Sequence, residues 1–207
     1  MRLVVEKVVR SFGPRRIFGP LSFVVERGRV LGIAGANGAG KTTLLRVLAG
    51  LLRPSAGRVV LEGVGGDGPA PTRDLPRAIG WAAPDTTLYG ELTAAENLEF
   101  FAEVAGEKRG SIGAAARLTH VGLDPARLAT LPSRMLSTGQ RQRLKIAYAT
   151  LASPPLLLLD EPGANLDEPG RAIVMKVVAA QRLHGMTVVA SNDLRDLALA
   201  DETVSLS

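Results

Sequence analysis

The stretch GIAGANGAGKTTLL, residues 32–45, decides which fold this chain adopts. Gly35 is followed, after four residues, by Gly40, Lys41 and Thr42, which is the spacing of a phosphate-binding loop. Glycines allow consecutive backbone N–H groups to curl around a phosphate, and the helix that follows directs its positive N-terminal end at the same anion. The stretch therefore predicts an α/β nucleotide-binding fold in which a buried strand leads into the loop.

The side chains of this loop divide the work of holding a nucleotide. Lys41 supplies a mobile positive charge for the outer phosphates, and the hydroxyl of Thr42 can bind Mg²⁺. A glycine-rich turn before a helix is the alternative, but the predicted strand 30–34 and helix 41–52 flank the loop as the motif requires. We expect the nucleotide to contact the whole loop, namely Gly35, Ala36, Asn37, Gly38, Ala39, Gly40, Lys41, Thr42 and Thr43.

A second polar site is predicted at the end of the strand 156–159, where four leucines precede Asp160 and Glu161. A continuous apolar run is typical of a strand covered on both faces. An acid in this place of a phosphate-loop enzyme meets the hydration shell of Mg²⁺, so we assign Asp160 to the metal. Glu161 can polarise an attacking water. A helix cap or a solvated turn would also explain two acids here, but the phosphate loop favours the functional interpretation.

A third polar strand tip follows the β-branched run 187–189, where Ser191, Asn192 and Asp193 occur together. A buried strand that ends in small polar side chains is typical of a ligand-binding edge of a parallel sheet. We therefore expect this tip to lie beside the other two.

The remaining pattern places these motifs in a mixed fold. Strands clustered at the start predict a small antiparallel lobe, and later strands that alternate with helices predict a parallel sheet. Thr93 and Glu96 predict a capping box, and the breakers in 63–76 predict a loop. Strands are predicted at 3–11, 21–25, 30–34, 58–61, 79–83, 156–159 and 187–189. Helices are predicted at 41–52, 92–106, 112–121, 125–129 (after a cap at Asp124), 139–151 and 169–184.

Composition excludes several classes of protein. A chain of 207 residues with 46% hydrophobic residues suits one globular domain. No cysteine is present, so disulfides and thiol chemistry are excluded, and the two histidines lie far apart. The net charge of +5 is scattered, so we expect no nucleic-acid partner. Glu6 and Lys7 interrupt the N-terminal apolar stretch and no 18-residue apolar run occurs, so we expect a cytoplasmic chain.

The stretch MLSTGQRQRLKIAYATLA, residues 135–152, adds a distinctive motif. With it the sequence closely resembles the ATP-binding cassette (ABC) ATPases, whose signature is usually Leu-Ser-Gly-Gly-Gln. A Ser and a Gly that open a helix make a second anion-binding N-terminus, which is expected to close on the nucleotide of a neighbouring chain. This matches the head-to-tail dimer of the family, with two ATP molecules between the chains. The signature here comprises Leu136, Ser137, Thr138, Gly139 and Gln140, with Thr in place of the first Gly.

The resemblance covers essentially the whole chain and implies its architecture. It implies an α/β P-loop NTPase cassette with a mainly parallel core sheet, a small antiparallel β lobe and a helical subdomain. Residues 1–207 would form a single nucleotide-binding domain, with the helical subdomain inserted at about 86–152. Phe12 matches the aromatic residue that stacks on adenine, although a core role is the alternative. Asp167 matches the residue that links the two sites across the dimer.

Two positions depart from the family pattern. Asp85 stands where the family usually has Gln; it can still bind Mg²⁺ or a water, but it adds negative charge near the γ-phosphate. Asn192 stands where the family usually has His in the catalytic site. Its amide can donate to a γ-phosphate oxygen, but it cannot carry a positive charge or pass a proton. These departures predict slow turnover.

The resemblance implies an ATP-hydrolysing, Mg²⁺-dependent subunit of a membrane transporter, driven by ATP-induced dimerisation with a second copy or a homologous cassette. LTAAENLEFF, residues 92–101, resembles the family segment that meets the membrane permease, so the region from Asp85 to Phe101 is the expected permease contact. The permease would hold the chain on the inner face of the cell membrane. The compact cassette favours an exporter and is similar to the haem-exporter ATPases of cytochrome c maturation. The alternative is a weakly hydrolysing switch or regulatory cassette paired with a more active partner.

Overall fold

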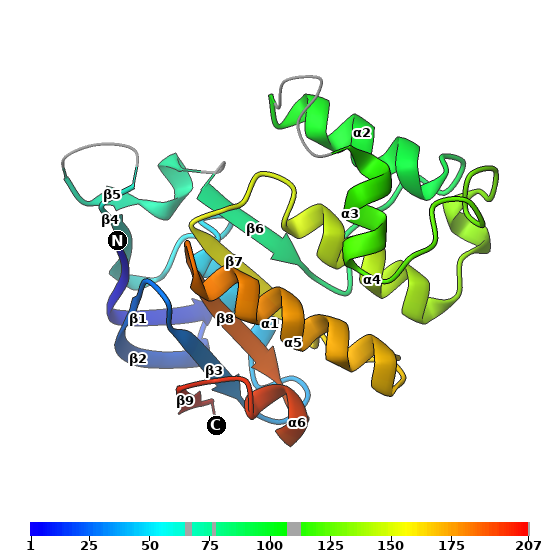
Figure 1. The fold of residues 1–207 in the computed structure, drawn as a ribbon. Coiled ribbons are helices and arrows are strands. Elements are labelled where there is room, and N and C mark those ends of the chain that lie inside the picture. The colour runs from blue at the N-terminus through cyan, green and yellow to red at the C-terminus, as the bar shows by residue number, and fades with distance from the viewer. Residues whose placement is uncertain (65–67, 76–77, 107–112, 207) are drawn as a thin grey trace.

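The phosphate-loop strand lies inside a five-stranded sheet in which all neighbouring strands are parallel (Figure 1). The computed structural model describes residues 1–64, 68–75, 78–106 and 113–206. In sheet order, the strands are β6 (Ile79–Ala82), β7 (Leu156–Asp160), β8 (Met186–Ser191), β3 (Val30–Ala34) and β9 (Glu202–Ser205). Because β7, β8 and β3 are neighbours, the three polar strand tips predicted from the sequence lie along one edge.

A second, antiparallel sheet lies at the N-terminal side of the molecule (Figure 1). Its long strands are rich in Val, Leu and Ile on the face that packs against the core. In sheet order, they are β2 (Arg15–Glu26), β1 (Arg2–Phe12), β4 (Ala56–Glu62) and the two-residue β5 (Ala70–Pro71). The expected combination of a parallel core sheet, an antiparallel lobe and helices is confirmed, and in the described residues the core sheet is wholly parallel.

Helices cover both faces of the parallel sheet. α1 contacts β7 and β8, whereas α5 contacts β8, and α4 contacts β6 and β7. In Figure 1, α2 and α3 lie with α4 at the side of the molecule away from the antiparallel sheet. The helices are α1 (Lys41–Leu48), α2 (Ala94–Val104), α3 (Ala114–His120), α4 (Thr138–Ala149), α5 (Glu168–Arg182) and α6 (Leu194–Leu197), with 3₁₀ turns η1 (Thr72–Asp74) and η3 (Ser133–Met135).

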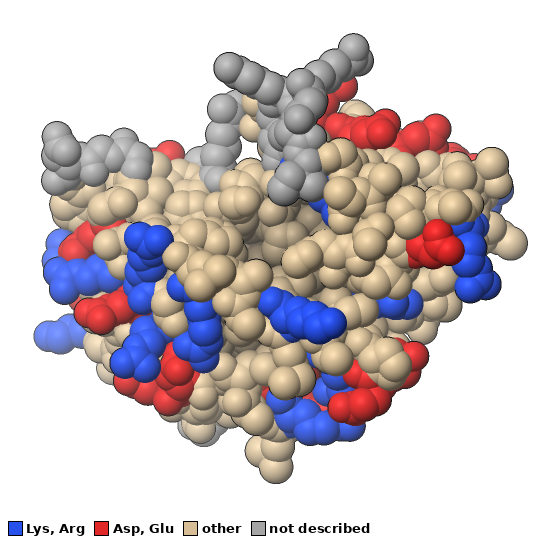
Figure 2. All heavy atoms as spheres, viewed as in Figure 1, with Lys and Arg blue, Asp and Glu red and all other residues tan. Residues whose placement is uncertain are grey.

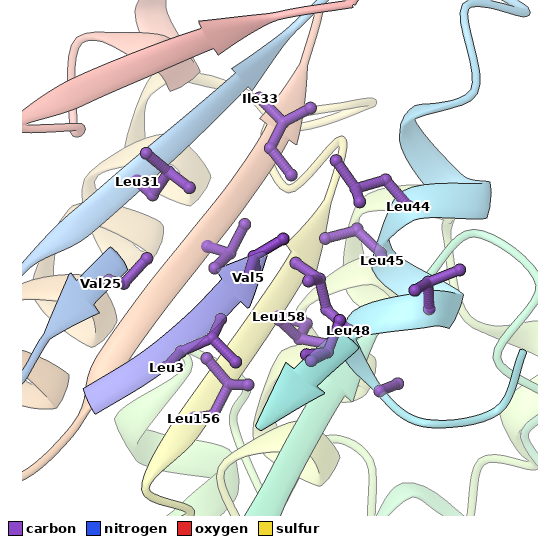
Figure 3. Packing of buried hydrophobic residues seen from close by; sticks show 14 of the residues in the cluster. Leu3, Val5, Val25, Leu31, Ile33, Leu44, Leu45, Leu48, Leu156 and Leu158 are labelled. Atoms are coloured by element: carbon purple, nitrogen blue, oxygen red, sulfur yellow. The ribbon is translucent and has the colours of Figure 1, made fainter. Parts of the chain in front are cut away.

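The leucine run of β7 shows how the sheet is covered on two sides. Leu156 and Leu158 pack into the cluster formed with α1 and the antiparallel sheet (Figure 3). Leu157 and Leu159 point to the opposite face and pack with α4 and α5. All four side chains are fully buried, and each contributes about 1.5–3 kcal/mol by leaving water. The continuous apolar run is therefore explained by burial on both faces.

The core beneath the phosphate loop joins the two sheets. Leu44, Leu45 and Leu48 project from one face of α1 toward Leu3 and Val5 of β1 (Figure 3). These residues lie three and four positions apart, which places them on one side of the helix. The helix that follows the phosphate loop is thus anchored by its apolar face, and its N-terminal end is left at the edge of the sheet.

Several local predictions need correction. Residues 125–129 form turns and no helix, although Asp124 Oδ1 accepts a hydrogen bond from Ala126 N at 2.9 Å as a cap would. The predicted loop 63–76 contains β5 and η1, and its residues 65–67 and 76 lie outside the described residues. Helix α1 ends at Leu48 and not at residue 52, because Gly50 adopts a left-handed backbone with φ 72°. α6 and β9 were not predicted.

The strand predicted at 21–25 is longer than expected, since β2 begins at Arg15. The other element predictions hold within a few residues. The capping box of α2 is present, since Thr93 Oγ1 accepts from Glu96 N and Glu96 accepts from Thr93 N. Residue 112, where the third helix was expected to begin, lies outside the described residues. Among the helices that the structure describes, none has the length and apolar composition of a membrane span.

Candidate nucleotide-binding site

The polar candidates from three strands converge at the carboxyl edge of the parallel sheet. Ala34 of β3 is paired with Ser191 of β8, and Asp160 of β7 is paired with Ala190 of β8. The residues that follow these strand ends must therefore lie side by side. This edge is where ligands bind in open α/β sheets.

Lys41 lies inside its own loop. The residue is only 6% exposed, and Nζ donates to Gly35 O at 2.8 Å and to Ala36 O at 3.3 Å. The same ammonium lies 3.2 Å from Glu161 Oε1. An ammonium held by two backbone carbonyls of the loop and one carboxylate is placed to bind the outer phosphates of a nucleotide.

Thr42 and Asp160 form a short hydrogen bond beside Lys41. Thr42 Oγ1 donates to Asp160 Oδ2 at 2.6 Å. Asp160 is 1% exposed, and burial raises the pKa of its carboxyl group, while the bond from Thr42 acts in the opposite direction. The described residues contain no cluster of three or more acids or histidines that could bind a metal. A hydroxyl and one carboxylate fit Mg²⁺, which usually takes one or two protein oxygens and completes its shell with water and phosphate.

Glu161 follows β7 in an unusual conformation. Its φ of 49° is left-handed, which costs a non-glycine residue about 1–2 kcal/mol. The backbone is held there because Glu161 N donates to Ala190 O at 2.8 Å. Glu161 Oε2 accepts from Ser191 Oγ at 2.8 Å and from Asn192 N at 3.4 Å. The side chain is thereby fixed at both oxygens, between Lys41 and the tip of β8.

Asn192 faces the phosphate loop. Its Nδ2 donates to Asn37 Oδ1 at 2.9 Å, which connects the tip of β8 to the loop that precedes α1. The sequence predicted a contact with the γ-phosphate, and the structure brings Asn192 to the loop where that phosphate is expected. Its catalytic role stays a prediction.

Asp85 lies in the loop after β6 and is held by a cation from α1. Arg46 Nη2 of α1 lies 2.5 Å from Asp85 Oδ2, and the Asp85 side chain is 57% exposed. Lys145 of α4 donates to Ala83 O at 3.2 Å and to Pro84 O, so the same loop is also tied to α4. Burial lowers the pKa of Lys145. The metal role of Asp85 stays a prediction, and one of its two carboxylate oxygens contacts Arg46.

Phe12 lies at the end of β1 with half of its surface exposed. This exposure contradicts a role in the core, which was the alternative to adenine stacking. The guanidinium carbon of Arg10 lies 4.2 Å from the centre of the ring and covers one face by a cation–π contact. Stacking on a base remains the prediction for Phe12.

The signature opens α4 with a complete capping box. Ser137 Oγ accepts from Gln140 N at 3.1 Å, and Gln140 Oε1 accepts from Ser137 N at 2.8 Å. Ser137 and Thr138 are exposed, whereas Leu136 is buried and anchors the segment. Because the Ser137 hydroxyl uses only an oxygen lone pair in the cap, its proton can still be donated to a phosphate.

Gly139 lies against the loop that leads to α5. A Cβ at Gly139 would come within 3.0 Å of Asn165 O, which explains why glycine suits this position. Asp167 caps α5, since its Oδ1 accepts from Gly170 N at 2.9 Å. The signature and the predicted dimer loop are therefore neighbours. Their contact with a second chain stays a prediction.

Two residues beside Glu161 were missed as site residues. Asp196 of α6 is 4% exposed and accepts from Ser191 Oγ at 2.9 Å. Arg171 of α5 lies 3.2 Å from Asp196 and 2.9 Å from Asp193. The only signal in the sequence was that both residues are charged. Surface residues are charged as well, so this signal does not mark a site.

A sequence model of the ABC transporter family, described as "ABC transporter", matches residues 18–164. The chain belongs to the ABC transporter family. This ABC cassette is the ATP-binding subunit of an ABC transporter and an ATPase coupled to transport. Cassettes of the family form dimers and pair with permeases.

Curated relatives resemble this ABC cassette over most of its length. It is 40% identical over 196 residues to the cytochrome c biogenesis ATP-binding export protein CcmA of Rhizobium meliloti, covering 92% of this chain and 90% of the relative. It is 36% identical over 194 residues to CcmA of Mesorhizobium japonicum, covering 94% and 92%. It is also 37% identical over 210 residues to the Fe(3+) ions import ATP-binding protein FbpC 2 of Rhodococcus jostii, covering 99% of this chain but 59% of the relative.

Solved structures have the same fold as this ABC cassette. A bacterial Atm1-family ABC exporter with ATP bound matches with a TM-score of 0.81 at 26% identity, covering 100% of this chain and 37% of that one. A dimeric bacterial ABC transporter cassette matches with a TM-score of 0.81 at 23% identity, covering 99% and 94%, which supports the fold alone.

Proposed function

We propose that this ABC cassette hydrolyses Mg²⁺–ATP with Glu161 as the general base and thereby energises export through a membrane permease. The observation that carries the proposal is the position of Glu161. Its carboxylate lies between Lys41 and Ser191, next to the hydrogen-bonded pair of Thr42 and Asp160. A carboxylate beside a phosphate-binding lysine is placed to accept a proton from a water that attacks the γ-phosphate.

The loop residues 35–43 would bind the phosphates through their backbone N–H groups. Lys41 would donate to the outer phosphates, which requires its contact with Glu161 to loosen. Thr42 and Asp160 would hold Mg²⁺, which neutralises charge on the transferred phosphate when bound. Asp85 would complete this site through a water once it is released from Arg46. Phe12 would stack its face opposite Arg10 on the adenine.

The signature would act on the nucleotide of a second cassette. Ser137 retains a hydroxyl proton, and Gly139 exposes the start of α4 beside the loop that leads to Asp167. A helix N-terminus with a hydroxyl donor suits a phosphate that comes from outside the chain. ATP would thus hold two cassettes together head to tail, and its hydrolysis would release them.

A permease segment would dock in a groove of about 620 Å³ between the parallel sheet and the helices. Arg46 and Asp85 lie at the wall of this groove, so docking there would act on the loop that carries Asp85. Acidic side chains gather over α2 beside it (Figure 2), which favours a partner segment with basic residues. The groove is lined by apolar side chains that include Trp81, Phe101, Val104, Tyr148 and Leu151.

Export is favoured over import by the relatives that match along most of their length. The two CcmA proteins named as export proteins are covered to 92% and 90%. The iron import protein has a further 41% of its length beyond the match, since only 59% is covered. We therefore place this cassette on the inner face of the cell membrane, bound to an export permease. Residues 1–207 would form one domain, with a helical subdomain at about 86–152.

Glu161→Gln tests the general base. It removes the acceptor for the proton of water and keeps the size of the side chain, so ATP turnover should fall by about 10²–10⁴ while ATP binding persists. The mutant should also accumulate as an ATP-bound dimer, measured by size-exclusion chromatography with ATP and Mg²⁺. The control Glu202→Gln makes the same change on the exposed strand β9 and should leave turnover as it is. Full turnover in Glu161→Gln would contradict the proposal.

A regulatory cassette with little turnover is the second candidate, and Asn192 supports it. An amide in this place cannot take a charge or relay a proton. Turnover measured on the purified cassette, alone and with its permease in lipid vesicles, separates the two. A working ATPase is stimulated by its permease, whereas a switch binds ATP and remains slow in both states.

A further inference from the structure

Ser191 lies between two carboxylates at the tip of β8. Its side chain is fully buried. Ser191 Oγ lies 2.8 Å from Glu161 Oε2 and 2.9 Å from Asp196 Oδ2, and it accepts a hydrogen bond from Asp193 N at 3.1 Å. A serine hydroxyl carries one proton. It can therefore donate to only one of the two carboxylates at a time.

The two carboxylates differ in what else they contact. Asp196 is held by Arg171 at 3.2 Å and by Gly163 N at 3.3 Å, and the Arg171 side chain is only 15% exposed. Among the described residues, Glu161 Oε2 has only the long contact from Asn192 N besides Ser191. Without the serine proton, Asp196 would still have two donors, Arg171 and Gly163 N, whereas Glu161 Oε2 would keep only the long contact from Asn192 N.

The backbone around Asp196 is shaped to keep it in this position. A Cβ at Gly163 would lie 2.3 Å from Asp196 Oδ1 and 2.4 Å from Arg171 Nη1, so only glycine leaves room for the ion pair. Arg171 also bonds Asp193, whose N–H donates to Ser191. Buried charges are costly unless they are paired and hydrogen-bonded. A paired acid placed against a serine next to the proposed base fits a role in orienting that serine.

We propose that Ser191 is a positioning residue for Glu161. Asp196 is the alternative hydrogen-bond acceptor to which the Ser191 hydroxyl turns, away from Glu161, during hydrolysis. This inference rests on the proposed role of Glu161 as general base. Before the reaction the hydroxyl donates to Glu161 and fixes the carboxylate. When the hydroxyl turns to Asp196, its oxygen presents a lone pair to Glu161.

The step transfers one proton from the attacking water to Glu161. An O–H bond of the attacking water breaks and an O–H bond forms on Glu161. The electron pair left on the water oxygen forms the new bond to phosphorus, while the bond from phosphorus to ADP breaks. Glu161, now protonated, donates to Ser191 Oγ, and Ser191 donates to Asp196. The serine thus reverses from donor to acceptor, and no proton leaves it.

The test compares three substitutions at Ser191 in the full chain. Ser191→Ala removes the hydroxyl, and Ser191→Cys replaces it with a thiol of similar size that is a weak donor and acceptor. Both should lower kcat by about ten- to hundredfold, a part of the effect of a general base, and leave the dissociation constant for ATP within about twofold. Ser191→Thr restores a hydroxyl and should restore most of kcat.

Thr187→Val is the matched control on the same strand. Thr187 is fully buried, and in the described part of the chain its Oγ1 has no hydrogen-bond partner. Replacing it removes a buried hydroxyl of β8 without touching Glu161, so kcat should stay unchanged. If Ser191→Ala gives no soluble protein, Ser191→Cys decides, because it preserves the packing.

Three results would overturn the inference. They are undiminished kcat in folded Ser191→Ala or Ser191→Cys, a folded Ser191→Thr as slow as Ser191→Ala, and a loss confined to ATP affinity. A double variant separates this inference from the proposed function. Adding Ser191→Ala to Glu161→Gln should cause no further loss of kcat, because the general base is already absent. Full turnover in Glu161→Gln removes the general base itself. A slow Glu161→Gln with a fast Ser191→Ala removes only the role of Ser191.

Discussion

Two helices of this cassette begin with residues suited to bind phosphate, and the surroundings of their N-termini differ. α1 follows the phosphate loop, and in the described structure no side chain caps its N-terminus at Gly40. Lys41 at its first position is buried against Glu161. α4 follows the signature, is capped by Ser137 and Gln140, and begins at exposed residues.

The difference indicates which groups each helix offers. The uncapped end of α1 offers backbone N–H groups and is completed by Asp160 of β7 and by Glu161, within the same chain. The capped end of α4 has satisfied one of its own N–H groups with Ser137 and offers the remaining hydroxyl proton to the outside. The contrast fits the proposal that the first site holds a nucleotide within one chain and that the second receives the nucleotide of another.

Lys41→Ala gives the largest expected effect and would break the first site. Removal of a charged donor to phosphate costs about 1.5–3 kcal/mol, which lowers ATP affinity by about ten- to a hundredfold or more. Turnover should be lost with it. Isothermal titration with ATP and Mg²⁺ measures the affinity, and Lys176→Ala on the exposed side of α5 is the control. ATP affinity equal to that of the unaltered chain would remove Lys41 from the site.

Ser137→Ala tests the second site and should have the next largest effect. Turnover should fall by about tenfold or more, because a donor to the phosphate of the second cassette is lost, while ATP binding to the single chain is kept. The change also removes a helix cap, which costs about 1 kcal/mol of stability. Thr93→Ala removes the equivalent cap from α2 and controls for it. Equal ATP turnover by isolated Ser137→Ala and Thr93→Ala proteins would mean that Ser137 acts only as a cap.

Asn192→His has the smallest expected effect and tests whether Asn192 limits hydrolysis in the first site. If a missing imidazole limits hydrolysis, turnover should rise by severalfold, within the range of a general acid–base group. Steady-state phosphate release measures it, with Asn192→Ala as the control that breaks the bond to Asn37 without adding a ring and should lower the rate. No gain from the histidine would mean that the site is built around the pair of Asn37 and Asn192.

Much of the fold followed from local patterns. The leucines of β7 indicated a strand buried on both faces, and Thr93 with Glu96 indicated the start of α2, because each pattern depends on residues that are close in the chain. The turn at 125–129 was taken for a helix, because a capping aspartate is common to both structures. β9 was missed, since four residues with mixed polarity carry little signal and their pairing with β3 comes from the sheet.

The sequence by itself determined the phosphate loop, the acids that end β7 and the signature that opens α4. These depend on the spacing of adjacent residues, and the backbone between them transmits that spacing directly. Only the tertiary structure decided that Asp85 meets Arg46, that Asn192 meets Asn37 and that Ser191 lies between Glu161 and Asp196. A polar side chain bonds the nearest suitable partner, and which partner is nearest depends on the order of strands in the sheet.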